Sequence, residues 1–316
     1  MNDAAWTVRI EGLSRFFGTL KAVHQVSFEI HPGEIFGFIG PNGAGKTTTL
    51  KILATLDDPD EGDVWVGSDS ILEAPDRVRG RIGFVPDRQG VYSNLSVREY
   101  LDFFARAYSL KGEKRRKAVE AILNFSGLEG LAERNCEELS KGMRQRLSFA
   151  RALIHDPDVL LLDEPMEGLD PRARIEFREL LTVLAQEGKA ILISSHILTE
   201  LAEFVSRVAI LEKGRLVTTG RVEDLARELA PAPVVRLRLR DGQDPAAAER
   251  LLVQLPGVRR VEVEGQVLRV EGDGEAPEGD RLVHALYGAG IRVQSFDSQE
   301  ANLEDVFLKF TRGDLA

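Results

Sequence analysis

The stretch GPNGAGKTTT, residues 40 to 49, decides which fold is expected for this chain. It follows the apolar run EIFGFI and precedes KTTTLKILATL, whose apolar residues have helical spacing. Its letters fit the pattern G-x-x-x-x-G-K-[ST] at every fixed position, and a strand before it with a helix after it is the context that this pattern requires. The stretch therefore predicts a phosphate-binding P-loop.

The residue types of this loop have chemical reasons to bind phosphate groups. Glycines allow successive backbone N–H groups to converge on phosphate oxygens at the positive end of the following helix. Lys46 would bring a mobile positive charge to the β- and γ-phosphates, and the Thr47 hydroxyl is a ligand for Mg²⁺. A glycine-rich turn that binds nothing is the alternative. The candidate nucleotide-binding residues are Gly40, Pro41, Asn42, Gly43, Ala44, Gly45, Lys46, Thr47 and Thr48.

A second motif, VLLLDEP at residues 159 to 165, supplies two carboxylates. Its four apolar residues predict a buried strand, so Asp163 would stand at the end of that strand as a second ligand for the metal. Glu164 comes next, where a carboxylate can take a proton from the water that attacks the γ-phosphate, or orient that water. An acidic turn without such a role is the alternative. Together with a P-loop, the motif predicts nucleotide hydrolysis.

Composition limits the other classes of function. With 316 residues, 43% of them hydrophobic, the chain is long enough for two domains. Its 41 basic and 51 acidic side chains give a net charge of −10, which disfavours binding to nucleic acid, so no nucleic acid partner is expected. The single cysteine, Cys136, cannot form an internal disulfide. No apolar run reaches the roughly 18 to 20 residues that span a bilayer, and the first residues lack a signal-peptide pattern, so we expect a cytoplasmic protein.

The pattern of the first two thirds of the chain predicts an α/β fold. The runs IFGFI, VLLLD and AILISS are densely apolar, as in a parallel sheet covered by helices on both faces. Helical periodicity between Asn94 and His155 predicts a helical insertion, a subdomain of about residues 90 to 156. We expect strands at Thr7 to Leu13, Ala22 to Ile30, Glu34 to Ile39, Asp63 to Val66, Arg81 to Val85, Val159 to Asp163, Ala190 to Ser195, Val208 to Leu211 and Arg215 to Thr219.

A different pattern begins near residue 231. The helix expected in VEDLARELA runs into Pro231 and Pro233, which discourage its continuation, so we expect domains at residues 1 to 230 and 231 to 316. The second part alternates between β-type and helical runs in the order β-α-β-β-α-β, which predicts a small α+β domain of the ferredoxin-like type. ANLEDVFLKF, residues 301 to 310, would add one amphipathic helix.

The segment LSKGMRQRLSFARAL, residues 139 to 153, lies shortly before VLLLDEP, and with it the chain resembles the ATP-binding subunits of ABC transporters. In that family LSGGQ opens a helix and contacts the γ-phosphate held by the P-loop of the other subunit. Ser140 could cap this helix and Gly142 would permit close approach to an anion. The resemblance implies ATP and Mg²⁺, and a P-loop NTPase core with an antiparallel β subdomain. It also implies a homodimer in the ATP-bound state, in which ATP is bound in trans by Ser140, Lys141, Gly142 and Met143.

The resemblance assigns further positions. Phe17 is similar to the aromatic residue that stacks on adenine, although Phe16 is adjacent and either ring could face the core. Asp170 is similar to a residue of the loop that links the two ATP sites. His196, after the strand AILISS, resembles the switch histidine that contacts the γ-phosphate. The catalytic residues implied are Lys46, Glu164 and His196, and the metal ligands implied are Thr47 and Asp163.

Some positions depart from the family pattern. Where many members have a glutamine that senses Mg²⁺ and the membrane subunit, this chain has Asp87, with Gln89 two residues later. An aspartate can still reach a cation directly or through water, so Asp87 is a further candidate metal ligand. Lys141 and Met143 differ from LSGGQ, and Lys141 could lie near the γ-phosphate or point to solvent. None of these departures removes a residue needed for hydrolysis.

The stretches IGFVPDRQGVYSNLSVREYL and ANLEDVFLKFT look most like bacterial exporter ATPases of the daunorubicin-resistance, sodium-export and polysaccharide-export group. Because ATPase and membrane chains are separate there, the resemblance implies an integral membrane permease as partner. The chain would then be peripheral on the inner face of the cell membrane. The C-terminal domain would be regulatory or dimer-supporting, or else a passive packing module.

The expected function is ATP-driven export by dimer closure. One alternative is a soluble ABC ATPase that acts on ribosomes or DNA, which the single P-loop, the acidic balance and the absence of a heptad run disfavour. Another is a nucleotide-dependent regulator with little turnover, for which Asp87 and the C-terminal domain are the motivating features. The cargo is not indicated.

Overall fold

The computed structural model describes residues 7–88, 90, 92, 94–197, 201, 204–229, 234–272 and 278–299. The chain divides into two compact units, Met1–Arg221 and Val222–Ala316. Helix α8 (Val222–Leu229) falls in the second unit, although the sequence places it before the expected domain boundary. The expected boundary rests on prolines that discourage continuation of a helix, which is a different criterion from the limit of a compact unit.

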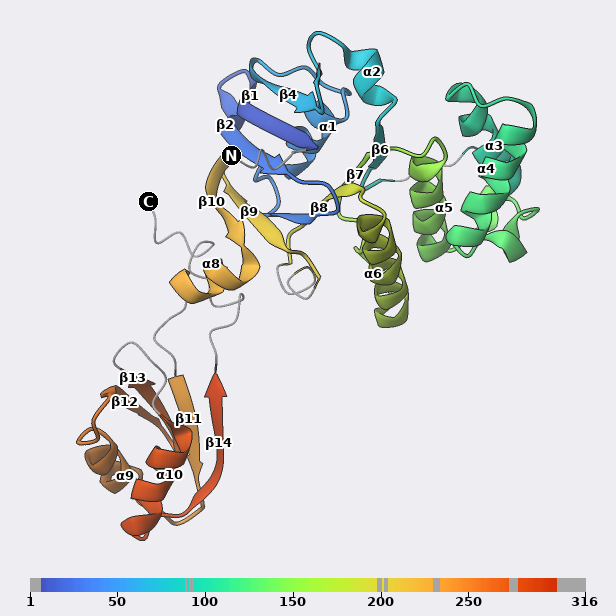
Figure 1. Cartoon of the computed structure of the whole chain (residues 1–316). Helices are drawn as coiled ribbons and strands as arrows, with labels where there is room; N and C mark the ends of the chain where they lie inside the picture. The colour runs from blue at the N-terminus through green and yellow to red at the C-terminus, as the bar shows by residue number, and fades with distance from the viewer. Residues whose placement is uncertain are drawn as a thin grey trace. The chain divides into compact units, whose positions relative to one another are not determined.

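A six-stranded sheet forms the centre of the first unit (Figure 1), in the order β10-β9-β3-β8-β7-β6. All pairs in it are parallel except β9 with β10. Every residue of β3, β7 and β8 is buried, as the continuous apolar runs predict for strands covered on both faces. Its strands are β3 (Ile35–Ile39), β6 (Ile82–Val85), β7 (Val159–Leu162), β8 (Ala190–Ser195), β9 (Arg207–Glu212) and β10 (Arg215–Arg221).

A second sheet, in the order β2-β1-β4-β5, is antiparallel throughout. Its strands are β1 (Val8–Phe17), β2 (Leu20–Ile30), β4 (Glu61–Val66) and β5 (Asp69–Ser70). The two-residue strand β5 is too short to leave a pattern in the sequence. One hydrophobic core joins side chains of this sheet, of the central sheet and of helix α1 (Lys46–Leu53), so the helix that follows the P-loop is held by both sheets. Short helix α2 (Pro75–Arg79) leads into β6.

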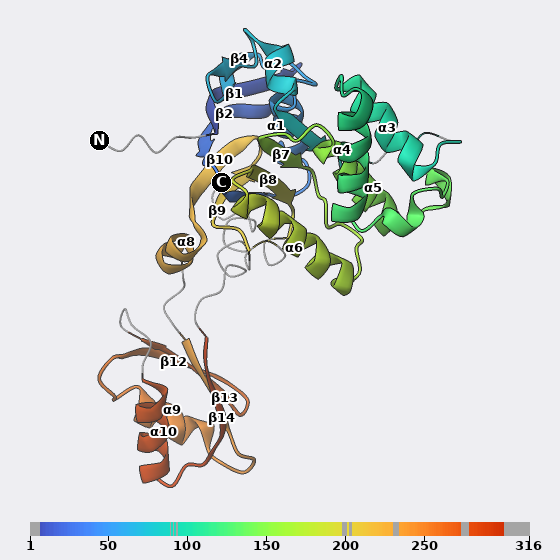
Figure 2. The ribbon, with the colours of Figure 1, turned by 45° about the vertical axis from the view of Figure 1, so that its right-hand side comes forward.

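The helical insertion lies beside the sheets (Figure 2), and its buried side chains form a core of their own. It contains α3 (Val97–Ala107), α4 (Gly112–Phe125), the 3₁₀ turns Glu129–Leu131 and Cys136–Glu138, and α5 (Lys141–Leu153). Ser96 and Glu99 form a capping box at the start of α3. Cys136 is fully buried in this core. The chain then returns through β7, and α6 (Pro171–Gln186) packs against β3 and β8.

The second unit contains the elements β11 (Val234–Leu239), α9 (Pro245–Leu252), β12 (Val258–Glu264), β13 (Val267–Gly272), α10 (Gly279–Gly288) and β14 (Val293–Gln299). Their order is the one that the sequence predicts. The sheet is antiparallel, in the order β12-β13-β11-β14, and its buried side chains form one core with α9 and α10. The helix predicted at residues 301 to 310 lies outside the described residues. Within the part of the chain that is described, no helix is long and apolar enough to cross a membrane.

The contact between β6 and α5 generates a stability prediction. Gly83 of β6 is buried, and a Cβ there would lie 2.3 Å from the Ala152 carbonyl oxygen and 2.8 Å from Leu160 Cδ2. Because a backbone oxygen cannot move aside cheaply, Gly83→Ala should lower the free energy of unfolding by about 1–3 kcal/mol, measured by urea denaturation. Gly130→Ala is the control, since a Cβ at Gly130 meets nothing within 4 Å. Equal stability of the two variants would show that this packing is not tight.

Candidate nucleotide-binding site

A cavity of about 660 Å³ lies beside the P-loop. It brings together predicted site residues from separate parts of the first unit. Parallel pairing explains this, because β3, β7 and β8 end at the same edge of the sheet and the candidate residues follow those ends. The predicted residues that line it are Phe17, Asn42, Gly43, Gly45, Lys46, Thr47, Thr48, Asp87, Glu164 and His196.

The P-loop runs close to neighbouring backbone, which explains two of its glycines. Gly45 precedes α1 with a φ of 104°, and a Cβ there would lie 2.3 Å from the Ala22 carbonyl oxygen. A Cβ at Gly40 would lie 2.5 Å from the Leu211 carbonyl oxygen. No other residue fits either position without moving backbone.

Lys46 is held inside this loop. Its Nζ donates to the Gly40 carbonyl at 2.7 Å and to the Pro41 carbonyl at 3.3 Å, and lies 3.3 Å from Glu164 Oε1. The side chain is only 6% exposed. The ammonium group is therefore fixed between the loop and the Glu164 carboxylate, where it can meet an anion that the loop binds.

Thr47 and Asp163 provide oxygen atoms suited to Mg²⁺. Asp163 follows β7 and is buried; its Oδ1 accepts a 2.8 Å hydrogen bond from Ser194 Oγ, and its carboxylate also bonds the Thr47 side chain. Burial raises the pKa of Asp163, against the hydrogen bonds from Ser194 and Thr47, which lower it. Hydroxyl and carboxylate oxygens are the ligands that Mg²⁺ prefers, so these residues fit the metal.

Asp87 lines the same cavity and adds a third oxygen group. Among the described residues, no three His, Cys, Asp or Glu side chains cluster as a metal site. Gln89 lies outside the described residues.

Glu164 stands between Lys46 and His196. Its Oε2 lies 2.9 Å from His196 Nδ1 and 3.3 Å from the His196 backbone nitrogen, which donates to it. Its φ of 47° is in the left-handed region, which is strained for a residue with a side chain. The surroundings therefore hold this carboxylate in one position at the cavity.

Ser194 is a residue that the sequence analysis did not select. Its fully buried hydroxyl donates to Asp163 Oδ1 at 2.8 Å and accepts from the Glu164 backbone nitrogen at 2.9 Å. One hydroxyl thus ties together the two carboxylate residues, including the strained one. The signal was present, because two serines end the otherwise apolar run AILISS.

Phe17, not Phe16, faces the cavity. Phe17 is 49% exposed and lines it, whereas Phe16 is half-buried with its ring 6.3 Å from the His24 ring. Further lining residues that the sequence analysis did not select are Leu20, Lys21, Ala22, Glu167 and Lys213.

The LSKGM segment does not line this cavity. Ser140 caps α5 by accepting from the Met143 backbone nitrogen at 3.3 Å. A Cβ at Gly142 would lie 3.5 Å from Leu169, and one at Gly168 would lie 2.5 Å from Lys141 Nζ. The Lys141 side chain is therefore beside the loop that ends at Asp170, which itself caps α6 by accepting from Ala173 at 2.9 Å.

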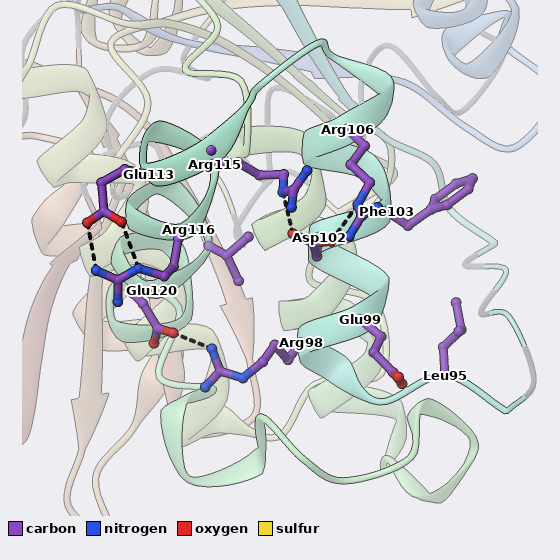
Figure 3. A pocket seen from close by; sticks show the side chains of 12 residues that line it. Leu95, Arg98, Glu99, Asp102, Phe103, Arg106, Glu113, Arg115, Arg116 and Glu120 are labelled. Atoms are coloured by element: carbon purple, nitrogen blue, oxygen red, sulfur yellow. Dashed lines mark hydrogen bonds and ion pairs between the residues drawn. The ribbon is translucent and has the colours of Figure 1, made fainter.

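A second cavity, of about 620 Å³, lies between α3 and α4 in the helical insertion (Figure 3). None of the predicted site residues lines it. Its charged side chains pair with one another: Arg106 and Arg115 both bond Asp102, and Arg116 bonds Glu113. Arg98 pairs with Glu120, and Glu99 accepts a hydrogen bond from the Ser96 backbone nitrogen, so every charged side chain of the lining has a partner within the insertion.

Comparison with known proteins shows the family to which this chain is similar. The family model described as ABC transporter matches residues 23–167. The chain is 38% identical to the Nod factor export ATP-binding protein I of Burkholderia thailandensis over 289 residues, which cover 92% of this chain and 91% of that protein. It is 36% identical to the protein of the same name from Paraburkholderia xenovorans, over 98% of both chains.

Solved structures also resemble the chain. An ATP-binding subunit of an ABC transporter matches with a TM-score of 0.65 and 28% identity, covering 70% of this chain and 92% of its own. A bacterial ABC transporter cassette in dimeric form matches with a TM-score of 0.63 and 28% identity, covering 68% and 98%. The same cassette bound to ADP and phosphate, in a post-hydrolysis state, has a TM-score of 0.62 with the same identity and coverage.

Removing the Ser194 hydroxyl should slow ATP hydrolysis, because this hydroxyl positions both carboxylate residues of the site. Ser194→Ala removes the hydrogen bonds that hold the Asp163 carboxylate and the Glu164 backbone nitrogen in place. The steady-state rate of phosphate release from ATP should therefore fall about 10- to 100-fold. Ser194→Thr keeps a hydroxyl and should retain more activity. Ser148→Ala is the matched control, because this buried hydroxyl has no hydrogen-bond partner. A normal rate in Ser194→Ala would exclude the positioning role.

Removing the Asp163 charge should stabilise the nucleotide-free protein. Burial raises the pKa of the Asp163 carboxyl in the folded protein above its value in the unfolded chain. The folded state is therefore favoured while this carboxyl is protonated at low pH, and that contribution to the free energy of unfolding is lost as the pH rises through the raised pKa. Asp163→Asn should therefore exceed the wild type in urea midpoint at pH 8 with EDTA, and the difference should shrink toward about pH 4.

The control for this measurement is Asp87→Asn, which changes an exposed carboxylate at the same cavity. Its unfolding free energy should stay within about 0.5 kcal/mol of the wild type. If Asp163→Asn is no more stable than the wild type at pH 8, burial of the Asp163 charge does not lower the free energy of unfolding.

Proposed function

This chain belongs to the ABC transporter family as an ATP-binding subunit of the exporter type, an ATPase, and on that premise we propose that two copies drive export through a separate membrane-spanning permease. The observation that carries the proposal is the Glu164 carboxylate, held between Lys46 and His196 at the cavity beside the P-loop. Such a carboxylate is placed to accept a proton from an attacking water, or to orient it.

The residues of one copy bind different parts of ATP and Mg²⁺ or act on the attacking water. The P-loop N–H groups and Lys46 bind the phosphates, and Phe17 offers a ring to the adenine. Thr47 and Asp163, with Asp87, would hold Mg²⁺, which when bound neutralises charge on the β- and γ-phosphates. Glu164 acts on the water, and His196 holds the Glu164 carboxylate and contacts the γ-phosphate.

The second copy would complete the site. Helix α5 begins at the cap residue Ser140 and has no acidic side chain in its first turn, so its positive end suits an anion. Because one chain leaves the LSKGM segment outside its own cavity, we assign ATP binding in trans to Ser140, Lys141, Gly142 and Met143. The dimeric cassette similar to this chain supports the arrangement. ATP would close the dimer, and hydrolysis would let it open.

The permease would contact the chain near the helical insertion and Asp87, and would place it on the cytoplasmic face of the membrane. Export is supported by the names of the relatives, which are export ATP-binding proteins. The second unit is proposed to be a ferredoxin-like domain, regulatory or dimer-supporting, on the basis of its β-α-β-β-α-β order and its sheet order β12-β13-β11-β14.

Glu164→Gln should trap the closed dimer. The amide keeps the size of the side chain but cannot accept a proton, so ATP should bind while phosphate release falls by about 100-fold or more. Light scattering after gel filtration in Mg-ATP should then give twice the monomer mass. Lys46→Ala is the control, since loss of phosphate binding should leave it monomeric. A Glu164→Gln protein that hydrolyses ATP normally, or stays monomeric in saturating Mg-ATP, contradicts the proposal.

A further inference from the structure

The two faces of the Phe17 ring have different surroundings. The Arg15 guanidinium carbon lies over the ring, 5.0 Å from its centroid. Phe17 also lines the cavity and is 49% exposed. Arg15 precedes Phe17 by two residues in β1, where register shifts in the pairing with β2 interrupt the regular alternation of side chains. Arg15 lies over the ring but does not line the cavity, so a ligand in the cavity would meet the part of the ring that the guanidinium leaves exposed.

Arg15 is itself held in place by two carboxylates. Its Nη2 lies 2.7 Å from Asp57 Oδ1 and its Nε lies 3.3 Å from Asp57 Oδ2, so this pair is bidentate. Its Nη1 lies 3.4 Å from Asp60 Oδ1. Asp60 also accepts a 2.6 Å hydrogen bond from the Phe16 backbone nitrogen. With only 22% of its side chain exposed, Arg15 has little freedom to leave the ring.

These anchors connect the ring to the phosphate-binding loop. Asp57 and Asp60 lie just beyond the end of helix α1, whose first residue is Lys46. The same helix that begins at the P-loop therefore leads to the carboxylates that hold Arg15. The anchors of Arg15 are thus connected to the P-loop through helix α1 and the residues that follow it.

We propose that Arg15 is a positioning residue for the nucleobase: it fixes Phe17 as a one-sided platform, so that a purine base stacks on the face open to the cavity. The inference rests on the proposed function, since it requires a nucleotide in this cavity. A guanidinium suits the task because it stacks flat on an aromatic ring, which an ammonium group cannot do. The ligand class is a nucleoside triphosphate, and Arg15 acts on its base and not on its phosphates.

The test distinguishes binding of the nucleobase from binding of the phosphates. Binding of Mg-ATP and of Mg-tripolyphosphate, which has no base, is measured by calorimetry on the full chain. Arg15→Gln should weaken ATP binding about five- to tenfold, while tripolyphosphate binding should change less than about twofold. Phe17→Ala should give the same split, and the double variant should lose little more than Phe17→Ala alone.

Two further variants keep the result interpretable. Arg98→Gln is the matched control, because Arg98 also holds two carboxylates, Glu120 and Glu133, but in the helical insertion; it should bind both probes normally. Arg15→Lys keeps a charge for Asp57 and should keep the fold, yet should not restore ATP binding, because an ammonium does not stack.

Several results would overturn the proposal. These are unchanged ATP binding in Arg15→Gln or in Phe17→Ala, full restoration by Arg15→Lys, or an equal loss of both probes, which would mean a general structural role. The proposed function fails separately, if Lys46→Ala binds tripolyphosphate as tightly as the wild type.

Discussion

Parallel pairing of β3, β7 and β8 is the constraint on which the site depends. The register places Ile39 beside Ser195 and Leu162 beside Ile193, so the residues that follow each strand emerge at one edge. The P-loop therefore meets the two carboxylates and His196, although more than a hundred residues separate it from them in the chain. Every residue of these three strands is buried, and loss of this burial disfavours a shift of register.

The P-loop lysine and the two carboxylates at this edge of the sheet are arranged so that each has a partner of opposite charge or a hydrogen bond. Asp163 is buried, Lys46 nearly so, and Glu164 lies between Lys46 and His196. Lys46 pairs with Glu164, and hydrogen bonds with the P-loop carbonyls, Ser194 and Thr47 occupy other polar atoms of these groups, which reduces the cost of burying the charges. ATP would add phosphates, and Mg²⁺ would add positive charge, to a site whose own groups are already fixed. Little reorganisation is then needed when the nucleotide binds.

The sequence alone predicted the strands of the central sheet, the P-loop and the carboxylates, because continuous apolar runs and fixed motif spacing leave few alternatives. It could not separate Phe16 from Phe17, since register shifts in β1 decide which ring faces the cavity. It also missed Ser194 and Arg15, whose importance depends on contacts with distant residues. A single hydroxyl or guanidinium carries no pattern of its own. The sequence therefore identifies the reactive groups but does not show which distant segments contact one another.

In the function proposed above, this chain is the motor of a separate membrane protein. The most direct measurement is purification of the tagged chain from its own cells in mild detergent, followed by mass spectrometry of what stays bound. We predict a multi-spanning membrane protein at close to one copy per ATPase chain, retained when nucleotide is supplied. Recovery of only soluble proteins or ribosomes would contradict the claim, while leaving the chemistry of the nucleotide site in place.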